Sequence, residues 1–326
     1  MKISIAGSGK IVGEVMQMLH DEFCGRIEVT GIFAREQSRQ KAETLCQQTG
    51  HPHTVVYTDY DQMLQHCEAD IVYIANANHV HYSYALKAMQ AGHHVLVEKP
   101  VAIDRAQTDA LYDCALQHCV FCIPAYSLLY MPLYQRLYEV LPQLGRIRMV
   151  NCCYAQYSSR YDRYLKGDVA PAFDPGQAGG ALMDLNVYNL CFTIGLFGPP
   201  CFSRIVDNKG YNGVDTSGCL ILQYPGFYAT LNAAKDCDGH NFGSIQGENG
   251  FIEVQGSVSV MESVRICIRG HEPVTWTAPA HRHRLSYEFE EVLHLLEDRD
   301  QCHINIPLVS RVAQEIAICI DHAKVN

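Results

Sequence analysis

The chain has 326 residues, too many for one average domain, and its hydrophobic content of 48% is enough to build the cores of two. Its formal charge of −10 argues against nucleic acid or an anionic membrane surface as a partner. No apolar run approaches the roughly 18 residues that cross a bilayer, and Met1–Ile5 resembles a strand rather than a signal peptide. We therefore expect a soluble, cytoplasmic protein.

Fifteen cysteines are scattered along the chain without regular spacing. Several lie inside apolar runs, where a free thiol behaves as a small hydrophobic side chain. Cys119 and Cys122 form a Cys-x-x-Cys pair, but no second pair completes a zinc site. Histidine pairs such as His51 and His53 lack neighbouring acid and cysteine ligands. We expect buried thiols and no bound metal.

The first third of the chain alternates short apolar runs with helical patterns. Strands are predicted at 3–6, 27–33, 55–57, 71–75 and 94–97, and helices at 10–20, around 39–43, at 60–66 and at 81–91. Short apolar strands separated by helices indicate a parallel sheet covered on both faces. Such sheets bind ligands beyond the carboxyl ends of their strands. Three polar or glycine clusters, at 7–9, 76–78 and 98–99, follow these ends and would share one edge.

After about residue 121 the pattern changes to successive strands with little helix between them. Strand-like runs lie at 146–154, 203–207, 218–224, 228–234, 243–246, 251–255, 259–262 and 263–268. They predict a mostly antiparallel sheet, with a helix at about 180–197 and two more helical stretches after residues 285 and 307. We predict an α/β Rossmann domain (1–121) followed by an α+β domain (122–326) for substrate binding and oligomerisation. Its large open sheet suggests a homodimer or homotetramer.

A glycine turn, Gly7-Ser8-Gly9, follows the first predicted strand. In the Gly-x-Gly-x-x-Gly fingerprint, backbone N–H groups approach a pyrophosphate at a helix N-terminus. Here Val12 takes the place of the third glycine and Gly13 comes one residue later. Because the third glycine serves helix–strand packing, this change does not remove the phosphate site. The residues predicted to bind the dinucleotide at this turn are Gly7, Ser8, Gly9, Lys10 and Ile11.

The end of the second strand bears on the choice between NAD and NADP. NAD-specific folds place an acid there, about 20 residues beyond the glycines, on the ribose 2′-hydroxyl. This chain has Ala34-Arg35 instead, with Arg39 one turn further on. A guanidinium is suited to a 2′-phosphate, although a solvated surface arginine is the alternative. The sequence favours NADP over NAD.

Two further clusters indicate proton chemistry. Glu98-Lys99-Pro100 ends the apolar run 94–97, where a lysine is either solvated or has a chemical role. Asp184 and Tyr188 are four residues apart, so on a helix they share one face. A buried carboxylate and phenol need partners, and a lysine ammonium suits both. Positive charge nearby lowers a tyrosine pKa from about 10, towards a value useful for proton transfer. A purely structural hydrogen bond is the alternative.

Taken together, these motifs resemble the Gfo/Idh/MocA family of NAD(P)-dependent oxidoreductases over almost the whole chain. The resemblance rests on the glycine turn, on Asn78 with His81, on Glu98-Lys99-Pro100, and on Gly179-Gly180 through Asp184 to Tyr188. Tyr188 places the chain with the tyrosine type, similar to dimeric dihydrodiol dehydrogenase and glucose–fructose oxidoreductase. One departure is Asn76-Ala77-Asn78, where the family usually has Thr-Pro-Asn.

The resemblance implies hydride transfer between a nicotinamide and a carbon bearing a hydroxyl or carbonyl, with NADP preferred or NAD as cofactor. Lys99 would polarise the reacting oxygen, Tyr188 would exchange its proton, and Asp184 would position the substrate and tune Tyr188. The further residues expected to bind the cofactor are Arg35, Asn76, Asn78, His81 and Glu98.

The polar, aromatic stretch 157–163 suits a sugar or other polyol, although a solvated loop is an equal alternative. The resemblance adds cyclic diols to the expected substrates. Two other functions stay open. One is a non-catalytic NAD(P)-binding regulator, which would be expected to lack the lysine or its acid–base partner. The other is redox-assisted glycoside cleavage, in which hydride is borrowed and returned.

Overall fold

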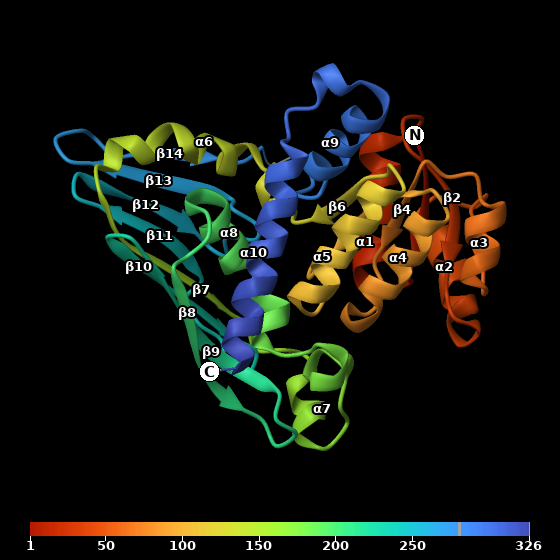
Figure 1. Ribbon diagram of the computed structural model, residues 1–326, viewed down its shortest axis with the longest axis horizontal. Coiled ribbons are helices and arrows are strands. Elements are labelled where there is room, and N and C mark those ends of the chain that lie inside the picture. The colour runs from red at the N-terminus through yellow and green to blue at the C-terminus, as the bar shows by residue number, and fades with distance from the viewer. Residues whose placement is uncertain (280–281, 326) are drawn as a thin grey trace. The chain divides into compact units, whose positions relative to one another are not determined.

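The computed structural model describes residues 1–279 and 282–325 of the chain. They form two compact units (Figure 1). Unit 1 comprises Met1–Ala125 with His281–Ser310, and unit 2 comprises Tyr126–Ala280 with Arg311–Asn326. Each unit contains its own β-sheet.

Unit 1 is built on a six-stranded parallel sheet in the order β3-β2-β1-β4-β5-β6, so the predicted parallel sheet is confirmed. All four residues of β4 are buried although successive side chains point to opposite faces, which means that both faces are covered. Strand β6 extends the sheet a few residues past the domain boundary predicted at residue 121. The strands are β1 (Lys2–Ala6), β2 (Glu28–Phe33), β3 (Val55–Tyr57), β4 (Ile71–Ile74), β5 (His94–Glu98) and β6 (Cys122–Ala125).

Helices alternate with these strands. The side chains of Asp59 and Asp104 cap α3 and α5 by accepting backbone N–H groups of the first turn. Helix α9 comes from a late part of the chain, and its buried Phe289 packs edge-on against Tyr73 of β4, with ring centroids 5.7 Å apart. The helical segments are α1 (Lys10–Phe23), η1 (Glu36–Ser38), α2 (Arg39–Gln48), α3 (Tyr60–His66), η2 (Asn78–Val80), α4 (His81–Gln90), α5 (Arg105–Gln117), α9 (Ser286–Glu297) and η8 (Arg299–Gln301).

Unit 2 contains an eight-stranded sheet in the order β14-β13-β12-β11-β7-β10-β9-β8. Only β7 and β10 pair in parallel among the described strands of this sheet, so the predicted, mostly antiparallel sheet is confirmed. The strands are β7 (Ile147–Ala155), β8 (Phe202–Lys209), β9 (Asp215–Tyr224), β10 (Phe227–Ala234), β11 (Phe242–Gly247), β12 (Gly250–Gln255), β13 (Ser263–Ile268) and β14 (Val274–Thr277).

Two details of this sheet differ from the sequence prediction. The strand predicted at 259–262 does not form, because residues 258–260 make a turn in which the Ser257 carbonyl accepts the N–H groups of Val260 and Met261. Strand β14 was not predicted, and it pairs with β13 at the edge of the sheet.

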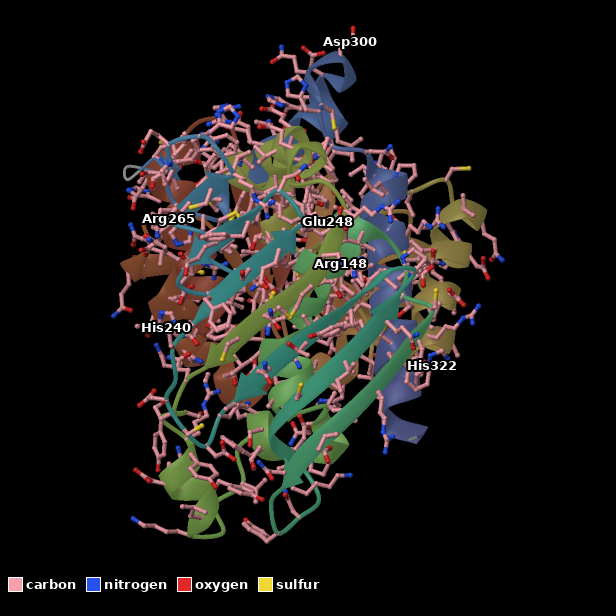
Figure 2. All side chains as sticks on the ribbon, turned by 90° about the vertical axis from the view of Figure 1, so that its left-hand side faces the viewer. Arg148, His240, Glu248, Arg265, Asp300 and His322 are labelled. Carbon is pink, nitrogen blue, oxygen red and sulfur yellow. The ribbon has the colours of Figure 1, made fainter. Side chains whose placement is uncertain are left out.

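The helical segments of unit 2 leave one face of the sheet open. Figure 2 shows this face turned to the viewer, with no helix in front of it. Its exposed apolar residues are Phe202, Val206, Ile221, Tyr228 and Phe251. The helical segments are η3 (Ser127–Tyr130), α6 (Pro132–Val140), η4 (Leu141–Leu144), α7 (Tyr161–Leu165), η5 (Pro171–Phe173), η6 (Pro175–Gln177), the π-helix η7 (Leu182–Asn186) and α8 (Val187–Phe197). Helix α10 (Ile306–Val325) begins in unit 1 and continues into unit 2 after Ser310.

The segment Pro175–Phe197 is long and apolar enough to cross a membrane, with a mean hydropathy of 1.2. The expectation that no such segment exists was therefore wrong. However, 78% of its 18-residue window is buried inside the protein, as in the core helix of a soluble protein. Its apolar character is explained by packing within unit 2.

Candidate active site

Gly7 lies where three strands of unit 1 end. Its N–H donates to the Phe33 carbonyl at the end of β2, at 2.9 Å. A Cβ on Gly7 would lie 2.5 Å from the Ala75 carbonyl oxygen just beyond β4, and the φ angle of +134° is itself unfavourable for a side chain. Glycine is therefore required at the turn that was predicted from the sequence.

Gly9 leaves open space at the N-terminus of α1. It is the N-cap of that helix, and no atom lies within 4 Å of the position that its Cβ would occupy. The first N–H groups of a helix have no partner inside it and attract anions, so this opening fits a pyrophosphate. Val12 is fully buried, while a Cβ on Gly13 would lie 3.3 Å from Leu45 of α2. Gly13, one residue beyond the usual third glycine, is therefore the position at which α1 packs closely against α2.

Asn76 follows β4 beside this turn. Among the described residues, neither polar atom of its side-chain amide has a hydrogen-bond partner, although both atoms are buried. Buried amides are normally hydrogen-bonded, and a ligand at this sheet edge would supply the missing partner. Asn76 therefore fits the dinucleotide site predicted for it. Asn78, two residues later, begins η2.

His81 joins the same loop to the segment that follows β5. Its ring is 1% exposed, with Nδ1 2.8 Å from the Pro100 carbonyl oxygen and Nε2 3.1 Å from that of Asn76. Burial lowers the pKa of His81, and the two carbonyls oppose this shift. The buried ring fixes the position of the loop, and its contact with a cofactor stays a prediction.

Glu98 and Lys99 lie at the end of β5. The Glu98 carboxylate accepts the Tyr73 hydroxyl at 2.6 Å and the Lys99 backbone N–H at 3.1 Å. Burial, and then the charge of Glu98, raise the pKa of Tyr73 well above its ordinary value, so this tyrosine stays a neutral donor. These bonds fix the Glu98 side chain against β4. The Lys99–Pro100 peptide bond is cis.

Glu288 is a carboxyl of unit 1 that was not predicted from the sequence. It lies on α9 with 1% exposure, and its Oε2 has no hydrogen-bond partner in the described part of the chain. Burial, and then the charge of Glu98, raise the pKa of Glu288 well above its ordinary value, with Arg284 opposing. The available signal was an acid between two aromatic residues, Tyr287 and Phe289, in a helix whose apolar residues recur on one side.

Arg35 lies just beyond the end of β2 and is exposed. Arg39, the second predicted phosphate ligand, pairs with Glu43 on its own helix at 3.0 Å. Over residues 1–279 and 282–325, Arg35 forms no ion pair, so its guanidinium is available to a phosphate.

In unit 2, the pair Gly179-Gly180 begins the helical segment predicted to be catalytic. A Cβ on Gly179 would lie 2.5 Å from the Pro171 carbonyl oxygen, and one on Gly180, where φ is +116°, would overlap the Asp215 carboxylate. Asp215 Oδ2 accepts the Leu182 N–H at 2.6 Å. Burial raises the pKa of Asp215 to about 6, against the effect of this hydrogen bond. Gly180 thus allows the close approach of Asp215 to the start of the helix, and Gly179 allows that of the backbone at 171–174.

Asp184 and Tyr188 follow on η7 and α8. Leu182–Asn186 is a π-helix, a widened turn that is frequent at functional sites. The Asp184 side chain is 37% exposed and accepts a hydrogen bond from Lys235 Nζ at 2.8 Å. The ring of Tyr188 lies 6.1 Å from that of Tyr154, centroid to centroid. The carboxylate thus pairs with a lysine, as the residue pattern suggested, but it is partly exposed and not buried as that argument assumed.

Lys235 itself was not predicted from the sequence, although a signal existed. It directly follows the apolar strand β10, just as Lys99 directly follows the strand that ends at Glu98. The same argument, that a lysine at the end of a buried strand is solvated or has a role, therefore applies to both.

The aromatic stretch predicted to face a substrate is ordered by ring stacking. Tyr161 of this stretch stacks on Tyr164, with centroids 5.9 Å apart, and Tyr164 in turn stacks on Phe173 and Tyr211, with centroids 4.9 and 4.6 Å apart. Tyr157 is 39% exposed, and its hydroxyl donates to Asp162 at 2.7 Å. The exposed part of the cluster offers both a ring face and polar groups.

A glycine turn that admits a pyrophosphate, on a parallel sheet, combined with an acid–tyrosine pair in a second unit, defines a nicotinamide-dependent oxidoreductase as a class. The chain belongs to the Gfo/Idh/MocA family of that class. Residues 1–126 match the family's N-terminal domain, an oxidoreductase domain with an NAD-binding Rossmann fold, and residues 136–253 match a GFO/IDH/MocA C-terminal domain. The resemblance inferred from the motifs is confirmed.

Individual relatives agree with this assignment. The chain is 30% identical over 301 residues to scyllo-inositol 2-dehydrogenase (NADP(+)) IolU of Bacillus subtilis, covering 91% of this chain and 89% of that protein. It is 27% identical to trans-1,2-dihydrobenzene-1,2-diol dehydrogenase of Xenopus tropicalis, covering 78% and 74%. Among solved structures, KijD10, a 3-ketoreductase from Actinomadura kijaniata in complex with NADP and TDP-benzene, matches with a TM-score of 0.84 at 18% identity, covering 100% and 97%. This match confirms the predicted fold.

Replacing Glu288 with glutamine is expected to stabilise the protein increasingly as the pH rises. The unfolded chain releases the Glu288 proton near pH 4.5, whereas the folded protein retains it, so wild-type stability falls above that pH until the raised pKa is reached. The slope is at most about 1.4 kcal/mol per pH unit, and glutamine removes it. Thermal unfolding between pH 5 and 8 measures this, with Glu272→Gln at an exposed position as control. If the stability gained by Glu288→Gln stays constant or shrinks as the pH rises, the raised pKa of Glu288 is contradicted.

Proposed function

We propose that the protein is an NADP-preferring dehydrogenase or reductase that transfers hydride between the nicotinamide and a carbon bearing a hydroxyl or carbonyl, in a sugar-like, polyol or cyclic diol substrate. The observation that carries the proposal is the Asp184 carboxylate, held by a buried lysine one turn before Tyr188. The names of IolU and of the Xenopus enzyme support it, since both refer to hydroxyl groups on a carbon ring.

The roles of the residues follow from their chemistry. The bound nicotinamide supplies or accepts the hydride at its C4. Lys99 polarises the reacting oxygen, Tyr188 donates or accepts its proton, and Asp184 orients the substrate and tunes the tyrosine. The backbone at Gly7–Gly9 binds the pyrophosphate, and the Asn76 amide gains a partner when the cofactor is bound. Lys99 and Tyr188 belong to different units, and that they serve one reaction is part of the proposal.

The purified protein is expected to reduce NADP with at least one member of a panel of sugars, inositols and cyclic diols. Lys99→Met should lower this turnover by about 100-fold or more, because it removes the ammonium but not the length of the side chain. Cofactor binding, followed by NADPH fluorescence, should be retained. The matched control is Lys87→Met, a lysine of the same unit that is half exposed and paired with Asp61 at 2.7 Å.

Unchanged turnover in Lys99→Met would refute the role proposed for that residue. Tight NADPH binding by the wild type without turnover of any compound would favour the regulator or the redox-assisted glycoside cleavage hypothesis.

Arg35→Ala is expected to weaken NADPH binding about tenfold or more, because a charge-assisted bond to the 2′-phosphate is lost, and to leave NADH binding nearly unchanged. Titration of both cofactors measures this. Arg105→Ala, which removes an exposed arginine paired with Asp109 on its own helix, is the control. Equal losses for the two cofactors would contradict the 2′-phosphate role.

We further propose a homodimer or homotetramer, located in the cytoplasm, that associates through the open sheet of unit 2. All fifteen cysteines are free, which suits a reducing compartment. On the open face, Val206 is 62% and Tyr228 46% exposed, and monomers rarely leave such apolar groups together in water. Glu253 lies opposite Arg265 on the same face, so two copies facing each other could exchange opposite charges. Arg265 is labelled in Figure 2.

Light scattering of the purified protein is expected to give at least twice the mass of one chain. The double variant Val206→Asp/Tyr228→Asp should shift it to the monomer, because two carboxylates would be buried at the interface. The control is Leu116→Asp, which places the same charge on an exposed leucine of unit 1. A monomeric wild type would refute the proposal, as would a double variant that keeps the wild-type mass.

A further inference from the structure

Lys235 is a buried cation whose place in unit 2 is closely fixed. Its side chain is only 2% exposed. Its backbone N–H donates to the Thr216 carbonyl at 2.8 Å, and its own carbonyl accepts the Ser158 N–H at 2.9 Å. The main chain is therefore held on both sides, and the ammonium has little freedom to leave its position.

Over the described residues, the ammonium contacts two oxygen acceptors and one aromatic ring, and it carries three N–H donors. Nζ donates to Asp184 Oδ2 at 2.8 Å and to the Ala172 carbonyl at 2.7 Å, and it lies 4.7 Å from the centroid of the Phe173 ring. A buried ammonium is stable only beside an anion, because its charge has lost its hydration. The neutral carbonyl and ring do not balance the charge, so the arrangement requires an ionised Asp184.

The same contacts connect Lys235 to the start of the catalytic helix. The Ala172 carbonyl that accepts Lys235 Nζ also accepts the Gly180 N–H at 3.1 Å. The Gly180 carbonyl in turn accepts the Asp184 N–H at 3.2 Å. Backbone and side chain of Asp184 are thus both tied to Lys235, which fixes the direction of the carboxylate as well as its charge.

The other acids near Lys235 have different partners. Asp215 accepts the Leu182 N–H, and burial raises its pKa to about 6 although the charge of Lys235 opposes this. Asp236 accepts the hydroxyls of Thr216 and Ser217 at 2.7 and 3.0 Å. Over the described residues, Asp184 is the acid that forms an ion pair with Lys235.

We propose that Lys235 is a positioning residue that holds Asp184 ionised and correctly directed beside Tyr188, and that it affects the reaction only through Asp184. The claim about the ion pair stands on the contacts above, and the claim about the reaction rests on the proposed function.

The first test is a double-mutant cycle in unfolding temperature with Lys235→Met, Asp184→Asn and the double variant. Each single change leaves a partner unpaired, so each should lower the unfolding temperature, and the double variant should lose clearly less than the sum of the two. Lys209→Met, at an exposed lysine of the same unit, is the control and should change little. Additive losses would overturn the proposed ion pair.

The second test measures kcat/KM against pH. Lys235→Met should lower kcat/KM at least tenfold at neutral pH and move the acidic limb of the profile to higher pH, because Asp184 then protonates more easily. In the Asp184→Asn background, the same change should cost no further activity. An equal loss in both backgrounds, with an unmoved acidic limb, would show that Lys235 is only structural.

If Lys235→Met does not fold, the pH profile of kcat/KM is measured on Lys235→Arg, because this variant keeps the positive charge. An acidic limb at the wild-type position then supports the proposal, and a shifted limb overturns it. A wild-type protein that turns over no substrate would contradict the proposed function and, with it, the kinetic claim for Lys235, whereas the unfolding cycle would still decide whether Lys235 holds the charge of Asp184.

Discussion

The cofactor side of this protein depends on one steric constraint, the meeting of three strand ends at Gly7. The Phe33 carbonyl at the end of β2 accepts the Gly7 N–H there, and the carbonyl beyond β4 comes so close that a side chain cannot be accommodated. Because Gly7 holds this position, α1 starts at the sheet edge with its first N–H groups uncovered. The buried amide of Asn76 lies beside the same point. The capacity to bind a dinucleotide is therefore a consequence of backbone packing.

In unit 2, the arrangement of the site depends on the burial of a charged side chain. The ammonium of Lys235 has almost no contact with solvent, and its position determines where the carboxylate of Asp184 must be. The glycine pair at 179–180 and Asp215 bring the start of the helical segment close enough for this pairing. A carboxylate held in this way one turn before Tyr188 is the basis of the role proposed for Asp184, because proton transfer depends on preorganised groups.

Much of the fold could be predicted because it is encoded locally. The short apolar runs and glycine turns of the first third determine parallel strands and helices with little help from distant residues. The return of 282–310 to unit 1 could not be predicted in this way, because α9 joins that core through contacts with residues distant in sequence, such as that of Phe289 with Tyr73. Strand β14 is likewise defined by its pairing with β13 at the sheet edge.

The same distinction between local motifs and contacts of distant residues applies to the candidate site. Gly7, Glu98 and Asp184 belong to short motifs with a chemical meaning, so the sequence was sufficient to propose them. Lys235 and Glu288 are distant in sequence from the groups that they affect, Asp184 and Glu98, and only the folded chain brings them together. Burial gives these two residues their importance, and burial is a property of the tertiary structure.

The most direct test of hydride transfer is to follow deuterium from NADPH labelled at C4, with the pro-R and pro-S labelled forms tested separately, into product, with keto-sugars, keto-inositols and cyclic ketones as acceptors. The account predicts one deuterium on the carbon that becomes a hydroxyl-bearing carbon, with matching loss from the cofactor. Label that stays on the cofactor with every acceptor, despite tight NADPH binding, would contradict it.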